Sequence, residues 1–153
     1  MILAIALVVL LVLLCVSGLF MWRRLARSNE RVIDAPVGEF EDFFWGGVMA
    51  RHIMTSGSLA RLEFFDWGVR LRGTVISRWV IPTWEARYDE ISIAELVALP
   101  HSRIAVWFRL RRDPATIAFM CDRTSQILPL LEKRGVPVNR SVTMIKSVDE
   151  LYR

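Results

Sequence analysis

The chain begins with a long uncharged stretch, and every charged side chain follows it. Residues 1–22, MILAIALVVLLVLLCVSGLFMW, lack charge, and Phe20 and Trp22 lie near their end. The next arginines are Arg23, Arg24 and Arg27. About 20 apolar residues in a helix span roughly 30 Å, the thickness of a bilayer's hydrocarbon core. Aromatic residues favour the membrane interface and arginines the cytoplasmic side. The pattern predicts a transmembrane helix over residues 1–22, with the N-terminus outside and the rest of the chain cytoplasmic, as in a single-pass protein of the cell inner membrane.

A cleaved signal peptide is the alternative interpretation of this stretch. Signal peptides have a basic start, an apolar core of about 7–15 residues and a small-residue cleavage site. Here no basic side chain precedes the apolar run, and the run is longer. The segment Val16-Ser17-Gly18 resembles a cleavage site, which keeps a secreted domain open as an alternative.

Residues 23–47 are expected to form a juxtamembrane linker with a short amphipathic segment. Phe40, Phe43 and Phe44 have the spacing of one helical face, which predicts a single turn that ends at Gly46. Such a turn would dock on its own domain, lie at the membrane interface or meet a partner. Phe40 and Phe44 are therefore candidate contact residues for a partner or for lipid.

Alternating apolar and polar positions then predict a β-rich domain over residues 48–136. Leu62 and Phe64 are expected on one face of a strand, with Arg61 and Glu63 on the other. The expected strands are 48–54, 59–65, 69–72, 84–88, 91–97, 103–111 and 116–121.

A helical pattern follows the last of these strands. Apolar Ile127, Leu128 and Leu131 form a stripe, and Gly135 is a typical helix terminator. Pro129 is expected within the first turn or just past it, where proline is tolerated. Residues 137–153 are expected to be a C-terminal tail.

This order of elements resembles the pleckstrin-homology superfold. The segments that carry the resemblance are LEFFDWGVRLRG, WEARYDEI and RIAVWFRLRRDPATIAFMCDRTSQILPLLEKRGV. They are similar to bacterial PH-like domains that follow a single N-terminal anchor. The resemblance implies a mainly β (α+β) fold, with a seven-stranded bent antiparallel sheet or partly open barrel closed by the C-terminal helix. Phosphoinositide-binding members resemble one another in a basic first hairpin loop, whereas residues 55–58 here, Thr-Ser-Gly-Ser, are uncharged.

The formal net charge of +4 does not indicate a nucleic-acid-binding protein. Four of the 20 basic residues follow the apolar stretch closely, and the remaining charges nearly balance. Those four are Arg23, Arg24, Arg27 and Arg31. Such a collar favours cytoplasmic topology and contact with anionic lipid.

Few residues are suited to catalysis. His52 and His101 lack the spacing of a metal site, and phosphate-binding or nucleophile motifs are absent from the sequence. Asp89 and Glu90 are adjacent, so in a strand they would point to opposite faces. Cys121 lies on an apolar strand, where free cysteine is usually a small core residue. The sequence predicts no enzyme, no cofactor, no metal and no small-molecule substrate.

The connection over residues 73–83 is unusually apolar. In one interpretation Val75 and Ile76 extend one strand, Val80 and Ile81 begin the next, and the true loop is short. In the other, Trp79 with Arg78 forms an exposed anchor for a partner or the membrane surface, because Trp and Arg dominate binding hot spots.

The predicted function is a membrane-anchored, non-catalytic PH-like module. Its helix would contact membrane lipid, and its domain would bind a protein, as a scaffold or an accessory subunit of an inner-membrane complex. The alternative is a peripheral domain that senses anionic lipid.

Overall fold

The computed structural model is mainly β. It describes residues 2–27, 30–34, 37–50, 53–99, 103–112 and 116–145. Within residues 2–27, side chains are described only for residues 7–18, 20, 21 and 24. The elements are α1 (Ile2–Arg27), β1 (Phe40–Ala50), β2 (Ile53–Met54), β3 (Ala60–Phe65), β4 (Gly68–Gly73), β5 (Trp84–Arg87), a 3-10 turn (Tyr88–Glu90), β6 (Ile91–Leu99), β7 (Arg103–Leu110), β8 (Ile117–Met120), α2 (Thr124–Lys133) and β9 (Val138–Met144).

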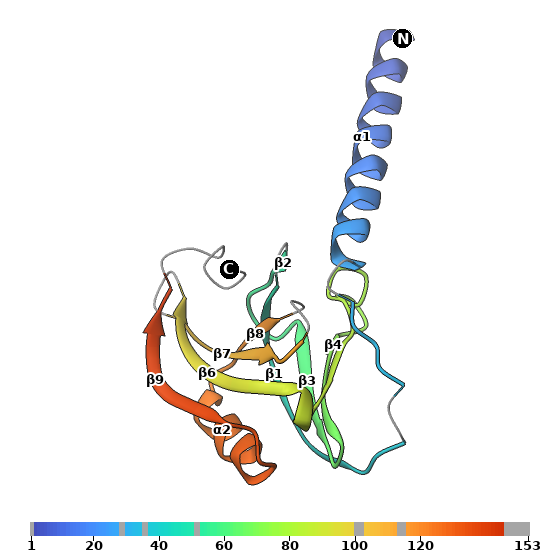
Figure 1. Cartoon of the computed structure of the whole chain (residues 1–153). Helices are drawn as coiled ribbons and strands as arrows, with labels where there is room; N and C mark the ends of the chain where they lie inside the picture. The colour runs from blue at the N-terminus through green and yellow to red at the C-terminus, as the bar shows by residue number, and fades with distance from the viewer. Residues whose placement is uncertain are drawn as a thin grey trace.

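The strands form one open, mixed sheet in the order β5-β4-β3-β1-β8-β7-β6-β9, with β2 paired to β1. Figure 1 shows this sheet strongly curved. Seven antiparallel strands were expected, but the described residues contain nine. The sheet is mixed because β9, within the expected tail, pairs parallel with β6.

The strand β1 belongs to both halves of the curved sheet. Residues from Phe40 to Gly46 pair with β3, and residues from Gly47 to Met49 pair with β8. A Cβ atom at Gly46 would lie 2.1 Å from the carbonyl oxygen of Met120, so only glycine permits this close approach. The predicted helical turn at Phe40–Phe44 is therefore wrong, since these residues lie in a strand whose register shifts between Phe40 and Asp42, and Phe43 and Phe44 point to opposite faces.

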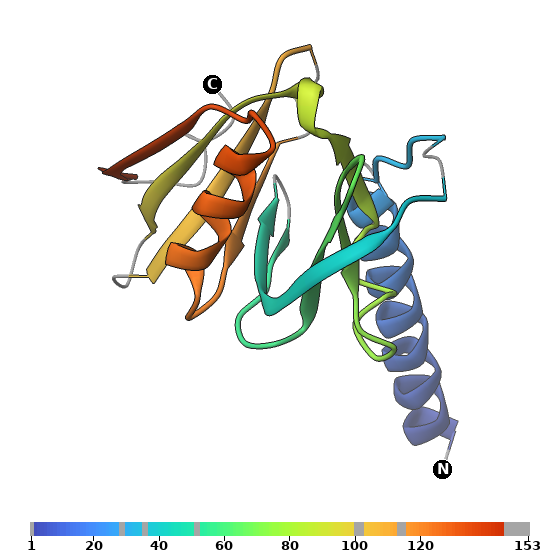
Figure 2. The ribbon, with the colours of Figure 1, turned by 90° about the horizontal axis from the view of Figure 1, so that it is seen from below.

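The core lies inside the curve of the sheet, where α2 covers it (Figure 2). Leu62 and Phe64 point into it with at most 1% of their surface exposed, which confirms their predicted face. The helix contributes Ile127, Leu128 and Leu131. Burial of such a side chain contributes about 1.5–3 kcal/mol to the free energy of unfolding, so the packing of α2 stabilises the inner face of the curved sheet.

The end of α2 is as expected, but its proline is deeper than expected. Gly135 has φ of +76°, which glycine adopts without strain, and its N–H donates to the carbonyl of Glu132 at 3.0 Å. Pro129 is the sixth residue of the helix. The proline is exposed, so its ring faces away from the core.

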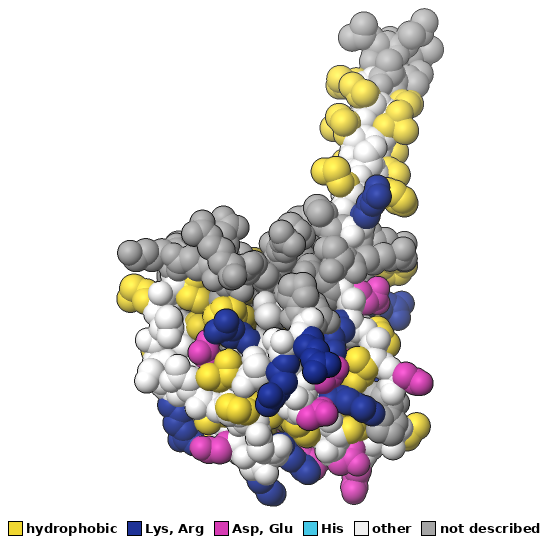
Figure 3. Space-filling view, in the orientation of Figure 1, with side chains coloured by type: hydrophobic (Ala, Val, Ile, Leu, Met, Phe, Trp, Pro, Cys, Tyr) yellow, Lys and Arg dark blue, Asp and Glu magenta, His cyan; other side chains and the backbone are white. Residues whose placement is uncertain are grey.

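The helix α1 projects away from the sheet (Figure 1), and Figure 3 shows hydrophobic side chains along it. Described apolar side chains between Leu7 and Met21 are each more than half exposed. Over the residues that are described, no helix has the length and apolar character that a membrane crossing needs.

Candidate binding surfaces

The structure separates the residues predicted as contacts. Phe40, Arg78 and Trp79 are exposed, whereas Phe44 is 5% exposed and packs in the core. Phe44 is therefore corrected from a contact residue to a core residue, because strand alternation turns it inward while Phe43 faces outward.

The residues predicted to mark the membrane interface are only partly described. Phe20 is 72% exposed and Arg24 is also exposed. The side chains of Trp22, Arg23 and Arg27 lie outside the described set, although the backbone of all three belongs to α1. His52 and His101 also lie outside the described residues.

Aromatic rings surround an arginine on the outer side of β1 and β3. The Cζ atom of Arg61 lies 4.5 Å from the ring centroid of Phe43, 5.7 Å from that of Phe40 and 5.8 Å from that of Trp45. The strand register explains this cluster, since Trp45 is directly opposite Arg61. These three rings are 40–47% exposed. Cation–π contacts of this kind hold the guanidinium over the rings.

A second arginine extends the cluster toward the end of β3. Arg70 lies with its Cζ 4.9 Å from the ring centroid of Phe65 and 5.8 Å from that of Trp67. The rings of Phe65 and Trp67 stack with centroids 5.3 Å apart. We call the combined surface the aromatic–arginine face; it comprises Phe40, Phe43, Trp45, Arg61, Phe65, Trp67 and Arg70. No local pattern in the sequence predicts this face, because only the pairing of β1 with β3 brings Phe43 and Trp45 to Arg61.

Buried carboxylates lie beneath the arginines of this sheet. Glu63 is 1% exposed, and its Oε1 lies 2.8 Å from Nη2 of Arg61 and 2.7 Å from Nη2 of Arg72. Neither contact has hydrogen-bond geometry, and among the described residues the buried Nε of Arg61 has no hydrogen-bond partner. Arg61 therefore retains an unused donor beside its aromatic neighbours.

The linker after α1 is attached to β5. The N–H of Arg31 donates to the carbonyl of Thr83 at 2.9 Å, and the N–H of Glu85 donates to the carbonyl of Arg31 at 2.8 Å. The guanidinium of Arg31 also contacts Oε1 of Glu90 at 2.7 Å. Partial burial alone would raise the pKa of Glu90, but hydrogen bonds from Arg31 and from the N–H of Arg87 outweigh it and lower that pKa.

The connection between β4 and β5 is an exposed loop. Val75 is 78% exposed, Ile76 87% and Trp79 58%, so neither Val75 nor Ile76 extends a strand. Ile81 is buried and holds the end of the loop on the core. We call residues 74–83 the apolar loop.

Two titratable groups that line hollows of this domain, Tyr88 and Cys121, have pKa values raised by burial. A hollow of about 750 Å³ is lined by Tyr88, Asp89 and several arginines. Burial, with a smaller contribution from the charge of Asp66, raises the pKa of Tyr88 to about 12. Burial also raises the pKa of the Cys121 thiol, which keeps it protonated. In the part of the chain that is described, no three His, Cys, Asp or Glu side chains are grouped to hold a metal ion.

Comparison with models of known protein families finds no match, and comparison with curated proteins finds none either.

Proposed function

We propose that this protein is a membrane-tethered, non-catalytic module that binds another protein through its aromatic–arginine face. The observation that carries the proposal is the group of exposed rings of Phe40, Phe43 and Trp45 around Arg61. Aromatic and arginine side chains supply most of the binding energy in protein interfaces. The partner would place apolar side chains on the rings and a carbonyl or carboxylate near Arg61.

The fold proposed for the domain is PH-like. Packing of the C-terminal α2 on the inner face of a curved sheet supports this (Figure 2). The expected antiparallel pairs from β3 to β5 and from β6 to β8 are also present. The parallel β9 departs from a purely antiparallel sheet.

A tether in the membrane is the second part of the proposal. The uncharged sequence of residues 1–22 and the exposed apolar side chains from Leu7 to Met21 support it, because water solvates such a surface poorly. Exposed Arg24, beyond the apolar stretch, supports a cytoplasmic domain. Confinement to the membrane raises the effective concentration of the domain for membrane-bound partners.

Site-specific photo-crosslinking in cells tests the binding surface. A photoreactive amino acid is placed at Phe43 in the full-length chain, and a matched probe at Val142 on β9, which is 51% exposed. We expect a discrete protein adduct from position 43 alone, identified by mass spectrometry and weakened by Trp45→Ala. Equal labelling from both positions, or no protein adduct from position 43, would overturn the proposed surface.

Extraction and topology experiments test the tether independently. Full-length protein should remain with membranes during carbonate washing, and a C-terminal reporter should be active only in the cytoplasm. Release by carbonate, or a reporter active only outside the cytoplasm, would contradict the proposed location whatever the crosslinking shows.

A further inference from the structure

The apolar loop exposes large hydrophobic side chains on a hydrogen-bonded turn. The N–H of Thr74 donates to Oγ of Ser77 at 2.8 Å, and the N–H of Arg78 donates to the carbonyl of Thr74 at 2.8 Å. The Ser77 hydroxyl, itself largely buried, also donates to the carbonyl of Leu59. The hydrogen bonds fix the backbone, so exposure of Val75 and Ile76 is a property of the folded loop and not of a frayed end.

The loop lies at the end of the domain from which α1 leaves. In Figure 1 the connection between β4 and β5 lies by the C-terminal end of α1, and in Figure 2 it lies over the middle of that helix. The last residue of the loop, Thr83, accepts the N–H of Arg31, and only residues 28–30 separate Arg31 from α1. The loop and the end of α1 are therefore held at the same end of the domain.

The chemistry of the loop is that of a shallow membrane contact. Val75 and Ile76 are aliphatic, and Trp79 has an amphipathic ring of the kind that favours the headgroup region. Arg78 lies with its Cζ 5.8 Å from the ring centroid of Trp79, and its exposed guanidinium can reach lipid phosphates while its stem stays on apolar surface. Exposed apolar side chains beside a membrane helix are covered most directly by the same bilayer.

We propose that the apolar loop inserts Val75, Ile76 and Trp79 into the headgroup boundary of the membrane that holds α1. The inference rests on the proposed tether. It adds a second lipid contact, which fixes the orientation of the domain and leaves the aromatic–arginine face for the partner.

Fluorescence quenching in vesicles tests the insertion with the full-length chain. Cys15 and Cys121 are replaced by serine, and an environment-sensitive dye is attached at Ile76→Cys or, as the matched control, at Val142→Cys. The protein is reconstituted into vesicles of phosphatidylcholine and phosphatidylglycerol. We expect the dye at position 76 to be quenched by lipids that carry a nitroxide near the headgroup. Its quenching constant for aqueous iodide should be about threefold or more below that of the control, because an inserted side chain is shielded from water.

The outcomes separate the loop from the tether. If carbonate leaves the protein in the vesicles but iodide quenches both dyes equally, the inserted loop is wrong and the tether stands. If carbonate releases the protein, both proposals fail. A photoreactive residue at position 76 that crosslinks a protein in cells, with no quenching by nitroxide lipid, would assign the loop to a protein partner and overturn the lipid contact.

Discussion

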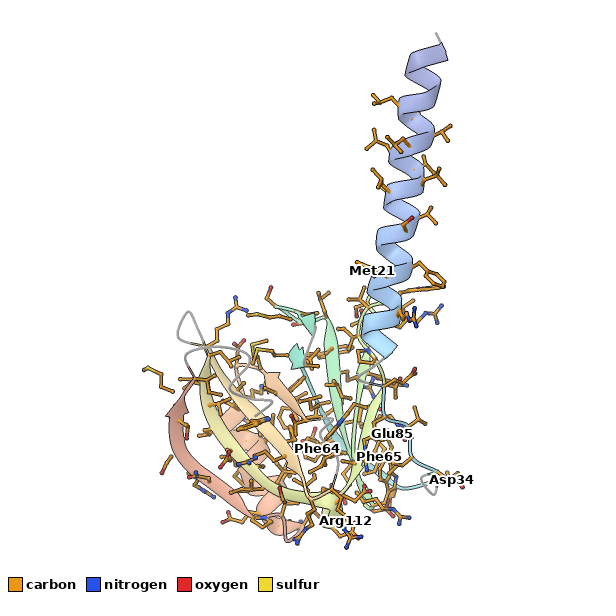
Figure 4. The ribbon with its side chains drawn as sticks, turned by 45° about the horizontal axis from the view of Figure 1, so that its top comes forward. Met21, Asp34, Phe64, Phe65, Glu85 and Arg112 are labelled. Carbon is orange, nitrogen blue, oxygen red and sulfur yellow. The ribbon has the colours of Figure 1, made fainter. Side chains whose placement is uncertain are left out.

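The side chain of Glu85 accepts a hydrogen bond from the backbone N–H of Ile33 at 3.0 Å, which joins β5 to the linker that follows α1. The same carboxylate accepts a hydrogen bond from Nε of Arg70 at 2.6 Å. Figure 4 shows Glu85 on the side of the domain along which the linker passes, with Asp34 farther out. One buried acid, 3% exposed, therefore connects the linker to the strand that carries part of the aromatic–arginine face.

Glu85→Gln should destabilise the domain more than a change at a surface pair. We expect the free energy of unfolding to fall by about 1–3 kcal/mol, because buried donors lose a charged acceptor. Urea denaturation of the detergent-solubilised full-length chain measures it. The matched control is Glu95→Gln. Oε2 of Glu95 lies 3.8 Å from Nη1 of Arg109, whose side chain is 50% exposed, so this change should lower the free energy of unfolding by about 0.5 kcal/mol or less. Equal losses at the two positions would contradict a special role for Glu85.

Gly46→Ala should disturb the crossing of β1 between the two halves of the sheet. The added methyl would meet the carbonyl oxygen of Met120 at 2.1 Å, and we expect a loss of about 1–3 kcal/mol or more in the free energy of unfolding. Thermal unfolding followed by circular dichroism measures it. Gly18→Ala is the control, since nothing lies within 4 Å of a Cβ there. An unchanged melting temperature for Gly46→Ala would contradict the close approach of β1 and β8.

Leu131→Ala should lower the free energy of unfolding far more than Leu130→Ala. Leu131 is fully buried in the core, and we expect a loss of about 2–5 kcal/mol in the free energy of unfolding. Leu130 is only partly buried, so Leu130→Ala should cost clearly less. Urea denaturation compares the two variants, and a larger loss for Leu130→Ala would show that α2 presents a different face to the core.

Alkaline titration should detect the raised pKa of Tyr88. Its phenol donates a hydrogen bond to the carbonyl of Phe65 at 2.7 Å and should ionise at a pH of about 12 in the folded protein. The unfolded chain loses this proton near its ordinary value of 10.0, so stability due to Tyr88 is complete below pH 10 and is lost as the pH rises toward 12. Ultraviolet absorbance follows the ionisation, and Tyr88→Phe removes that phase. A Tyr88 phase near pH 10 in the folded protein would contradict its burial.

Alternation of apolar and polar residues predicted most strands. It failed at residues 40–44, whose spacing fits the period of a helix as well as that of a strand. Leu62 and Phe64 lie on the predicted face because alternation with charged neighbours allowed one interpretation. Phe40, Phe43 and Phe44 also fit a helical face, and only pairing of β1 with β3 decides for a strand. The strand β9 could not be predicted, because its residues are largely exposed and its pairing with β6 is a tertiary contact.

The candidate surfaces were predictable to different degrees. The composition of residues 73–83 drew attention to Trp79, and the structure resolves the alternatives for Val75 and Ile76 in favour of an exposed loop. The contacts of Arg61 depend on neighbours in another strand, so no local pattern shows them.

The hydrogen bonds between Arg31 and β5 fix the point at which the chain enters the β domain. This point lies at an edge strand of the sheet and four residues after Arg27, the last residue of α1. A force that pulls the linker away from the domain would therefore load β5 before the other strands. Through Glu85, which holds both Ile33 and Arg70, the load would reach the aromatic–arginine face.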